Sequence, residues 1–451
     1  MKMIYDVKDK PKFGALIVFA FQQLLAIMAA TIAVPMIVGN GMSTSAALFG
    51  AGIGTLVYVA FTRAKSPVFL GSSFAFLGSM AAAFAGATSV GLGYIGLIIG
   101  AILAGLVYVV IAIIVKAVGV NWISKLMPAV VIGPTVAIIG LSLAGNAIGD
   151  LQTSSYEGGS TYVALICGLV TLAVTMLCSV YGKKMAKLIP FIIGILAGYA
   201  VATCFYFIGK ATGNTELMVI NYSALVNNFK NITFSSFFSL PDFTFIKAFG
   251  SFGELNGSYI GTIAAAYIPV AFVVFAEHIA DHKNLSSILE RDLLEEPGLS
   301  NTLLGDGVGS MVGAFFGGCP NTTYGESVGC VAITKNASVA TIIVTAIEAI
   351  LISFITPFVA FLSTIPNCVM GGVCIALYGF IAVSGLKMLQ QVDLDDNRNL
   401  FTASVILIAG VGGLTLTFGN DNFAITITEV AAALILGILT NVMLGRKKKD
   451  K

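Results

Sequence analysis

The feature that most constrains this chain is a succession of apolar stretches, each long enough to cross a lipid bilayer as a helix of about 20 residues. Only 10% of its 451 residues are charged, and 57% are hydrophobic. Soluble domains carry about 25% charged residues. The sequence therefore predicts an all-α polytopic membrane protein. Twelve ordinary spans are expected at 14–38, 45–62, 90–115, 126–147, 160–181, 188–209, 258–281, 300–318, 338–361, 366–387, 400–417 and 424–444.

Two further segments are shorter and interrupted by Pro, Gly and Ser. One covers 67–86 and begins PVFLGSSFAF, and the other covers 319–335 and begins CPNTTYGESV. In hydrocarbon, irregular backbone is tolerated only where it is buried in protein or lines a wet cavity. We therefore expect PVFLGSS and CPNTTYG to pair as short antiparallel strands. Each strand would be followed by a half-helix whose N-terminus points at a central cavity.

Positive charge gathers at both ends of the chain, with four lysines in the first twelve residues and a basic run from Arg446 to Lys451. Because Lys and Arg are concentrated in cytoplasmic loops, both termini are expected in the cytoplasm, and the short loops fit fourteen spans better than thirteen. The broken segments are then the third span of each set of seven. An odd number of spans per half places the halves in opposite orientations, which is typical of many secondary transporters.

Acids inside the predicted spans are the main functional candidates, because a charge at membrane depth costs at least about 2.5–3.5 kcal/mol. Glu277 and Asp281 lie one helical turn apart and share a face, and Glu326 lies within the second broken segment. Glu277 and Glu326 together suit a small planar ligand with N–H and C=O groups, since an ionised carboxylate accepts and a protonated one also donates. Burial favours the neutral form, so such acids could also carry protons.

Other polar and aromatic residues in the spans are further candidates for a functional or structural role. Asp281 is a second candidate for proton relay, and Asp306 is either a polar anchor between helices or a member of the relay. Glu348 and Glu429 are interpreted as structural or interfacial acids. His278 is interpreted as a packing or interhelical hydrogen-bonding residue. Three aromatic side chains could stack on or close over a planar ring: Phe74, Tyr324 and Tyr378.

Five segments, AEHIAD, PNTTYGES, ESVGCVAITK, SPVFLGSSFAF and VMGGVCIALYG, together resemble the nucleobase–ascorbate transporters, or nucleobase:cation symporter-2 family, and specifically its bacterial uracil permease branch. The resemblance implies proton-coupled uptake across the bacterial cytoplasmic membrane, usually by a homodimer, without another cofactor. It also implies two inverted repeats of seven spans. A core domain would comprise 1–125 and 258–364, and a gate domain would comprise 126–257 and 365–451.

The resemblance also implies roles for individual residues. Glu277, Asp281 and Glu326 would couple transport to protons. The nucleobase would be bound by Glu277, Glu326, Gly325, Phe74, Tyr324, Tyr378 and Ala30.

Three positions depart from the family pattern. Asp281 stands where uracil permeases usually have His, Ser327 stands where Asn is usual, and Gln22 and Gln23 replace a Gln-His pair. Uracil remains the favoured ligand, with xanthine, guanine or another purine base as the alternative.

Rival functions fit the sequence less well. An intramembrane aspartyl protease would need a Gly-x-Gly-Asp motif, and Asp306 follows Leu303, Leu304 and Gly305 instead. An anion transporter of related architecture should carry a cation near the broken helices, where this chain has acids. A passive channel would not need two buried titratable acids. The seven cysteines show no CxxC spacing, so we expect neither disulfides nor a metal site. No nucleic-acid partner is expected.

Overall fold

The computed structural model describes residues 3–119, 128–183, 185–420 and 423–445, and most of these residues are helical. Eight helical stretches are long and apolar enough to cross a membrane by length and composition, and four shorter apolar helices accompany them. The predicted class, a helical polytopic membrane protein, is confirmed. The arrangement of fourteen spans as two inverted repeats stays a prediction.

In the first half of the chain the helices follow the predicted apolar stretches, and the fourth stretch is divided after Ser142. They are α1 (Phe13–Val38), α2 (Thr44–Phe61), α4 (Val90–Val118), α6 (Ala129–Ser142), α7 (Ala144–Leu151), α8 (Thr161–Tyr181), α9 (Met185–Leu188) and α10 (Pro190–Thr212). The polar region that follows is an ordered connection. It contains η2 (Thr215–Leu217), α11 (Ser223–Lys230), η3 (Phe234–Ser236), α12 (Thr244–Ala248) and η4 (Phe252–Glu254).

The second half opens with the longest helix and closes with two shorter apolar ones. Its helices are α13 (Gly257–Leu289), η5 (Leu294–Gly298), α14 (Leu299–Gly317), α16 (Val339–Ser353), α17 (Thr356–Leu362), α18 (Asn367–Leu389), α19 (Asn397–Val411) and α20 (Glu429–Leu444).

The two broken segments form the predicted strand pair. β1 (Leu70–Ser72) and β2 (Asn321–Thr323) are antiparallel, with Leu70 opposite Thr323 and Ser72 opposite Asn321. β1 leads into η1 (Phe74–Phe76) and α3 (Leu77–Ala85), and β2 leads into α15 (Gly325–Thr334). Each strand satisfies part of the backbone of the other, so irregular chain is tolerated at this depth.

Two predicted spans differ in extent from the observed helices. The stretch 338–361 is divided into α16 and α17, because Pro357 lacks a backbone N–H and is accommodated in the first turn of a new helix. The stretch expected to end at 281 continues to Leu289. Its last turns are polar and therefore escape a search for apolar segments.

The predicted spans 400–417 and 424–444 are wrong where they face each other. There β3 (Leu416–Asn420) and β4 (Phe423–Ile427) form an antiparallel hairpin. Gly413, with a φ of 71°, follows the end of α19. The sequence LTLTF leads into β3, and ITIT spans the end of β4, so that Thr alternates with apolar residues in both places. This period of two is a strand signal that a search for apolar stretches does not detect.

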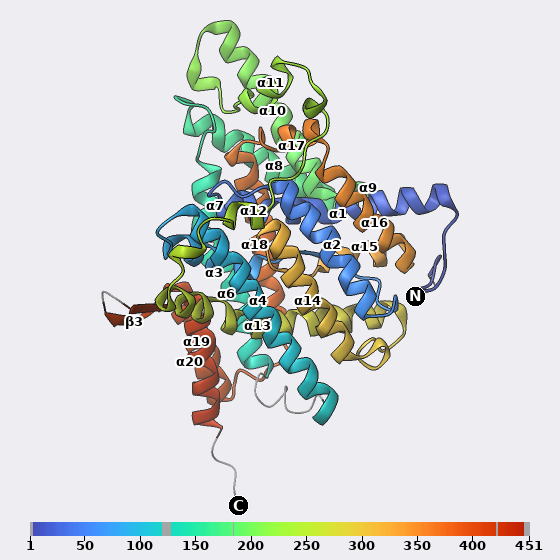
Figure 1. Cartoon of the computed structure of the whole chain (residues 1–451), viewed down its shortest axis with the longest axis vertical. Coiled ribbons are helices and arrows are strands. Elements are labelled where there is room, and N and C mark those ends of the chain that lie inside the picture. The colour runs from blue at the N-terminus through green and yellow to red at the C-terminus, as the bar shows by residue number, and fades with distance from the viewer. Residues whose placement is uncertain (1–2, 120–127, 184, 421–422, 446–451) are drawn as a thin grey trace, which may run out of the picture.

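The helices pack in two groups, and each group draws on both halves of the chain. In the first group α14 packs against α2 and α4, and α16 packs against α1 and α2. In the second group α18 packs against α6, α7 and α8, and α19 packs against α6 and α20. Figure 1 shows the mixing, with yellow α14 among blue α2 and cyan α4. The strand pair belongs to the first group, because β1 contacts α2 and β2 contacts α14.

Glycines allow α2 and α14 to approach closely beside the strand pair. A Cβ atom at Gly54 would lie 2.7 Å from the carbonyl oxygen of Gly309, and a Cβ atom at Gly309 would lie 2.7 Å from that of Gly54. One helical turn along, Gly50 meets Gly313 in the same way. Small residues at such crossings are how helices pack within membranes.

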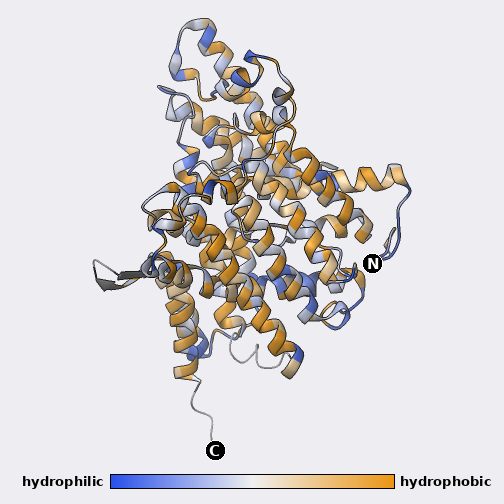
Figure 2. Ribbon diagram, in the orientation of Figure 1, coloured by the Kyte–Doolittle hydropathy of each residue, from blue (hydrophilic) through white to orange (hydrophobic). Residues whose placement is uncertain are grey.

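The outward faces of the long helices are apolar. Exposed side chains include Leu106 and Val110 on α4, Leu177 on α8 and Phe207 on α10. Figure 2 shows apolar residues covering the helical body, with hydrophilic residues gathered in the loops beyond it. An apolar surface of this extent is expected where helices face lipid.

Candidate functional site

A cavity of about 360 Å³ lies where the paired strands turn into their half-helices. This volume suits a small ligand, since ligand pockets typically measure about 300–1,000 Å³. The strand-pair side of the cavity is lined by Ser73, Phe74, Ala75, Thr322, Tyr324, Gly325 and Glu326. Glu277, Ala280 and Asp281 of α13 also line it. The opposite wall consists of Val136, Ile139, Phe191, Leu377, Phe380, Ile381, Ser384 and Met388.

Three acids from two elements face this one cavity. Glu277 and Asp281 come from successive turns of α13, and Glu326 comes from the first turn of α15. Among the described residues that line the cavity there is no Lys, Arg or His to neutralise them. An unpaired charge is costly in such surroundings. The acids must therefore be balanced by bound protons, by donors of a ligand, or by both.

Asp281 is partly committed to the protein. Its Oδ2 accepts a hydrogen bond from the hydroxyl of Thr323 over 2.8 Å, which joins α13 to strand β2. Its Oδ1 lies 3.8 Å from the position that a Cβ atom would take at Gly325. One oxygen thus anchors the strand, and the other stands beside the start of α15.

Gly325 begins α15 and is exposed to the cavity. The first N–H groups of a helix have no partner within that helix. A side chain at this position would project toward Asp281, whereas glycine leaves the N–H approachable. Phe74 holds the corresponding place at the start of η1. Both helix starts therefore present donors, at the ends where the helix dipole favours negative charge or a carbonyl oxygen.

Tyr324 has a double role. Its ring lines the cavity and packs on Gly71, where any Cβ atom would collide with the ring. Its hydroxyl donates to the carbonyl oxygen of Ser72 over 2.7 Å. The phenol therefore fastens the start of α15 to strand β1.

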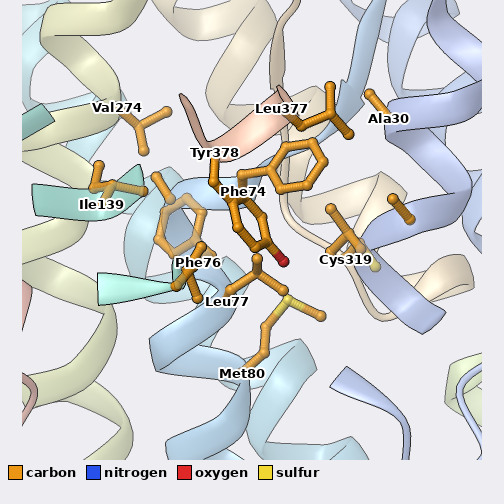
Figure 3. Packing of buried hydrophobic residues seen from close by; sticks show 14 of the residues in the cluster. Ala30, Phe74, Phe76, Leu77, Met80, Ile139, Val274, Cys319, Leu377 and Tyr378 are labelled. Atoms are coloured by element: carbon orange, nitrogen blue, oxygen red, sulfur yellow. The ribbon is translucent and has the colours of Figure 1, made fainter. Parts of the chain in front are cut away.

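Two of the predicted site residues stand behind the cavity wall. Tyr378 is buried against Phe74, with ring centroids 6.1 Å apart and the rings nearly perpendicular. Ala30 of α1 is buried in the same apolar cluster. Figure 3 shows Phe74 and Tyr378 packed among Leu377, Ile139 and Ala30. The structure thus brings together Glu277, Asp281, Glu326, Gly325, Tyr324 and Phe74, and places Tyr378 and Ala30 outside that lining.

The wall contributed by α6, α10 and α18 was missed from the sequence. Val136, Ile139, Phe191 and Phe380 are ordinary apolar residues of ordinary apolar spans. Nothing in their local pattern distinguishes them from lipid-facing or core positions. Only the tertiary arrangement, which brings α6, α10 and α18 to the same cavity as the strand pair, reveals them.

Both histidines lie in a buried network beside the cavity. His278 Nδ1 lies 2.6 Å from Asp306 Oδ2, and its Nε2 lies 3.0 Å from the hydroxyl of Thr302. His282 Nδ1 donates to the carbonyl oxygen of His278 over 2.8 Å, and Tyr58 meets its Nε2 at 2.7 Å. The interhelical hydrogen-bonding role predicted for His278 is confirmed.

The remaining acids lie apart from the lining. Asp306 is fully buried on α14, and its Oδ2 lies 3.5 Å from the hydroxyl of Thr322, which does line the cavity. Glu348 is half-buried on α16. Glu429 begins α20, with its Oε1 3.8 Å from the Cβ position at Gly78 of α3. Asp306 is therefore one residue removed from the cavity, and Glu429 lies between the two helix groups.

A second cavity of about 750 Å³ lies toward the opposite ends of the same helices. It reaches Asn367 and Met370 on α18 and Asp150 on α7, whereas the first cavity reaches Leu377 to Met388 on α18 and Val136 on α6. Residues between them on α18, such as Val373 and Cys374, are buried. A closed apolar layer therefore separates the two cavities.

Comparisons with known proteins find similar sequences over nearly the whole chain. The profile of a family described as the permease family matches residues 14–418. The uracil permease of Bacillus caldolyticus is 39% identical over 445 residues, covering 98% of this chain and 95% of that protein. The uracil permease of Bacillus subtilis (strain 168) is 36% identical, covering 100% of this chain and 97% of that protein. The uracil permease of Escherichia coli (strain K12) is 34% identical, covering 96% of this chain and 92% of that protein.

Two solved structures share the fold at low sequence identity. The transmembrane domain of the cyanobacterial bicarbonate transporter BicA superposes with a TM-score of 0.62 at 14% identity, covering 98% of this chain and 100% of that one. The murine anion transporter Slc26a9 gives a TM-score of 0.62 at 11% identity, covering 97% of this chain and 69% of that one. At such identities the similarity concerns the fold alone.

Proposed function

Because the chain belongs to the nucleobase–ascorbate transporter family, the permease family whose profile spans residues 14–418, we propose that it is a proton-coupled uracil importer. Membership makes it a multi-pass membrane transporter and not an enzyme. The uracil permeases that resemble it over nearly their whole length support uracil as the substrate. The observation that carries the proposal is the pair Glu277 and Glu326, which face one small cavity without a cation among its described lining.

Uracil offers two ring N–H donors and two carbonyl acceptors in one plane, and the cavity can meet both kinds of group. Ionised Glu277 and Glu326 can each accept an N–H, and a protonated carboxyl can donate to a carbonyl. The first N–H groups of η1 and α15, at Phe74 and Gly325, supply further donors to a carbonyl oxygen. The ring of Tyr324 and the apolar wall would cover the faces of the base.

Proton coupling follows from the balance of charge. Three acids without a cationic partner favour at least partial protonation, so a proton that binds with the substrate removes an unpaired charge. Glu277 and Glu326 would then hold substrate and proton at one site, and Asp281, one turn from Glu277, would relay the proton. The proton is the only coupling ion invoked, and no other cofactor is needed.

The two helix groups suggest how the site changes sides. We assign residues 1–125 and 258–364 to a core domain that carries the strand pair, and residues 126–257 and 365–451 to a gate domain. Movement of the core against the gate would open one cavity and close the other, because buried residues of α18, such as Val373 and Cys374, lie between them. We further propose that the chain forms two inverted repeats of seven spans and assembles as a homodimer. It would lie in the bacterial cytoplasmic membrane with both termini in the cytoplasm.

A purine base is the second candidate, and Asp281 is the observation that favours it. Its Oδ1 stands beside Gly325 and offers an additional acceptor next to the site. Xanthine carries one more ring N–H than uracil, and guanine carries an exocyclic amino group, so either base could use that acceptor.

Thermal stabilisation of the purified protein separates these candidates, because a ligand that binds only the folded state raises its apparent stability. The panel comprises uracil, thymine, xanthine, hypoxanthine, guanine, adenine, urate and ascorbate. A shift that is selective for uracil supports the proposal. A shift for xanthine or guanine without one for uracil supports the purine alternative, and a flat response to all eight contradicts both.

A further inference from the structure

A buried hydroxyl immediately after Glu326 joins three elements behind the cavity. Ser327 lies in the first turn of α15, and its Oγ is 2.6 Å from Nε2 of Gln23 on α1. The backbone N–H of Phe69, just before β1, donates to the same Oγ over 3.0 Å. Gln23 and Ser327 are only 3% and 0% exposed. Two donors from distant parts of the chain therefore converge on one hydroxyl.

The direction of these bonds is fixed by a further contact. Nε2 of Gln23 also lies 3.4 Å from the carbonyl oxygen of Ser327, which can only accept, so the nitrogen end of the amide faces α15. A serine oxygen has two lone pairs. The N–H groups of Gln23 and Phe69 occupy both of them. The loss of the hydroxyl would leave the buried N–H of Phe69 without this acceptor, and Gln23 with only its longer contact to the carbonyl oxygen.

The two bonds constrain the orientation of α15. Successive residues point about 100° apart around a helix, so a fixed Ser327 side chain fixes the direction in which Glu326 points. The bond from Phe69 also ties α15 back to the start of β1, while β1 pairs with β2 and β2 leads into α15. Ser327 thus closes a ring of contacts around the start of the half-helix.

We propose that Gln23 and Ser327 form a positioning pair that holds Glu326 in its substrate-binding orientation. Neither residue is among those that line the cavity, so the pair acts through Glu326 and the first N–H groups of α15. The inference rests on the proposed function, because it concerns the same nucleobase site. Gln23 therefore contributes to affinity from the far side of the half-helix.

A double-mutant cycle on uracil binding tests the pair. Gln23→Met keeps a side chain of similar length without a donor, and Ser327→Ala removes the acceptor. Gln22→Met is the matched control, because Gln22 is adjacent on α1 but points about 100° away. We expect each of the two variants to raise the Kd for labelled uracil about fivefold to tenfold, as loss of a buried hydrogen bond predicts. The double variant should resemble Ser327→Ala alone, and Gln22→Met should bind like the parent.

The readout separates positioning from a general loss of structure. A folding defect lowers the number of binding sites and the melting temperature without ligand, whereas a positioning defect raises the Kd of the sites that remain. If Ser327→Ala yields no folded protein, Gln23→Met against Gln22→Met decides alone. The pair is refuted if the two fold-changes multiply in the double variant, if both glutamine variants behave alike, or if both single variants bind like the parent. If the parent protein binds none of the bases, the proposed function itself is wrong.

Discussion

Glu326 illustrates how one side chain is specified by its surroundings. It follows a strand that needs a partner, begins a helix whose N–H groups need acceptors, and faces a cavity shared with Glu277. A carboxylate placed there can accept a ligand N–H, and a carboxyl can donate to a carbonyl. An amide of the same shape always presents two donors and one acceptor oxygen, so it cannot reproduce either state fully.

Glu326→Gln is accordingly expected to weaken uracil binding by about 100-fold, because hydrogen bonds to charged groups contribute about 1.5–3 kcal/mol. Equilibrium binding of labelled uracil to purified protein measures the effect. Glu348→Gln on α16 is the control, since Glu348 does not line the cavity. Unchanged binding by Glu326→Gln would show that the assigned site is wrong.

Asp281→Asn tests the assignment of the relay. Asparagine can still accept from Thr323, so the link between α13 and β2 should survive and uracil binding should change less than about threefold. Accumulation driven by a pH gradient should fall at least about tenfold, because the amide cannot exchange a proton. Binding and accumulation are measured on the same preparation. Equal losses in both would assign Asp281 to binding instead of relay.

The predicted residues that line the cavity stand out from an ordinary membrane helix. Glu277, Asp281 and Glu326 are acids in apolar spans, and Gly325 and Tyr324 belong to a segment whose Pro, Asn and Thr residues do not suit a membrane helix. Ala30 came from family resemblance alone and Tyr378 also from its aromatic ring, and the structure places both outside the lining. The apolar residues of that wall carry no local signal, because their role arises only from tertiary packing.

At the scale of elements, the pairing of β1 with β2 was predicted from the sequence. The hairpin of β3 and β4 was missed, although the sequence carries a signal for it. β1 and β2 were found because polar, Gly-containing segments in a membrane must satisfy their backbone. β3 and β4 lie in a segment apolar enough to pass as helix, and its alternation with Thr was overridden by hydropathy. The division between α16 and α17 was also missed, because it follows from the missing N–H of Pro357 and not from hydropathy.

The crossing of α2 and α14 yields a prediction about stability. In Gly309→Ala the new methyl group would meet the carbonyl oxygen of Gly54 at 2.7 Å, a backbone atom that cannot turn away. Overpacking of this kind costs about 1–3 kcal/mol, so the melting temperature should fall by several degrees. Gly145→Ala on α7 is the control, because nothing lies within 4 Å of its Cβ position. A Gly309→Ala variant as stable as that control would contradict the close crossing.

At the scale of the whole molecule, the fold alone does not define the cargo. Transporters of bicarbonate and other anions share this architecture at 14% and 11% identity, so the residues of a site, and not the fold, must select the substrate. This chain places three acids there and no described cation in the cavity lining, which suits a neutral base and a proton. Span number, orientation and dimerisation remain predictions, because they depend on a bilayer and a second copy.

The central claim is that uracil and protons move together through the cavity of Glu277 and Glu326. Its most direct test is uptake of labelled uracil by proteoliposomes with an acidic exterior and an alkaline interior. The account predicts accumulation above the external concentration, its collapse on addition of a protonophore, and no accumulation by Glu326→Gln. Uptake that only equilibrates uracil, or that ignores the pH gradient, would contradict proton coupling and indicate a passive pathway.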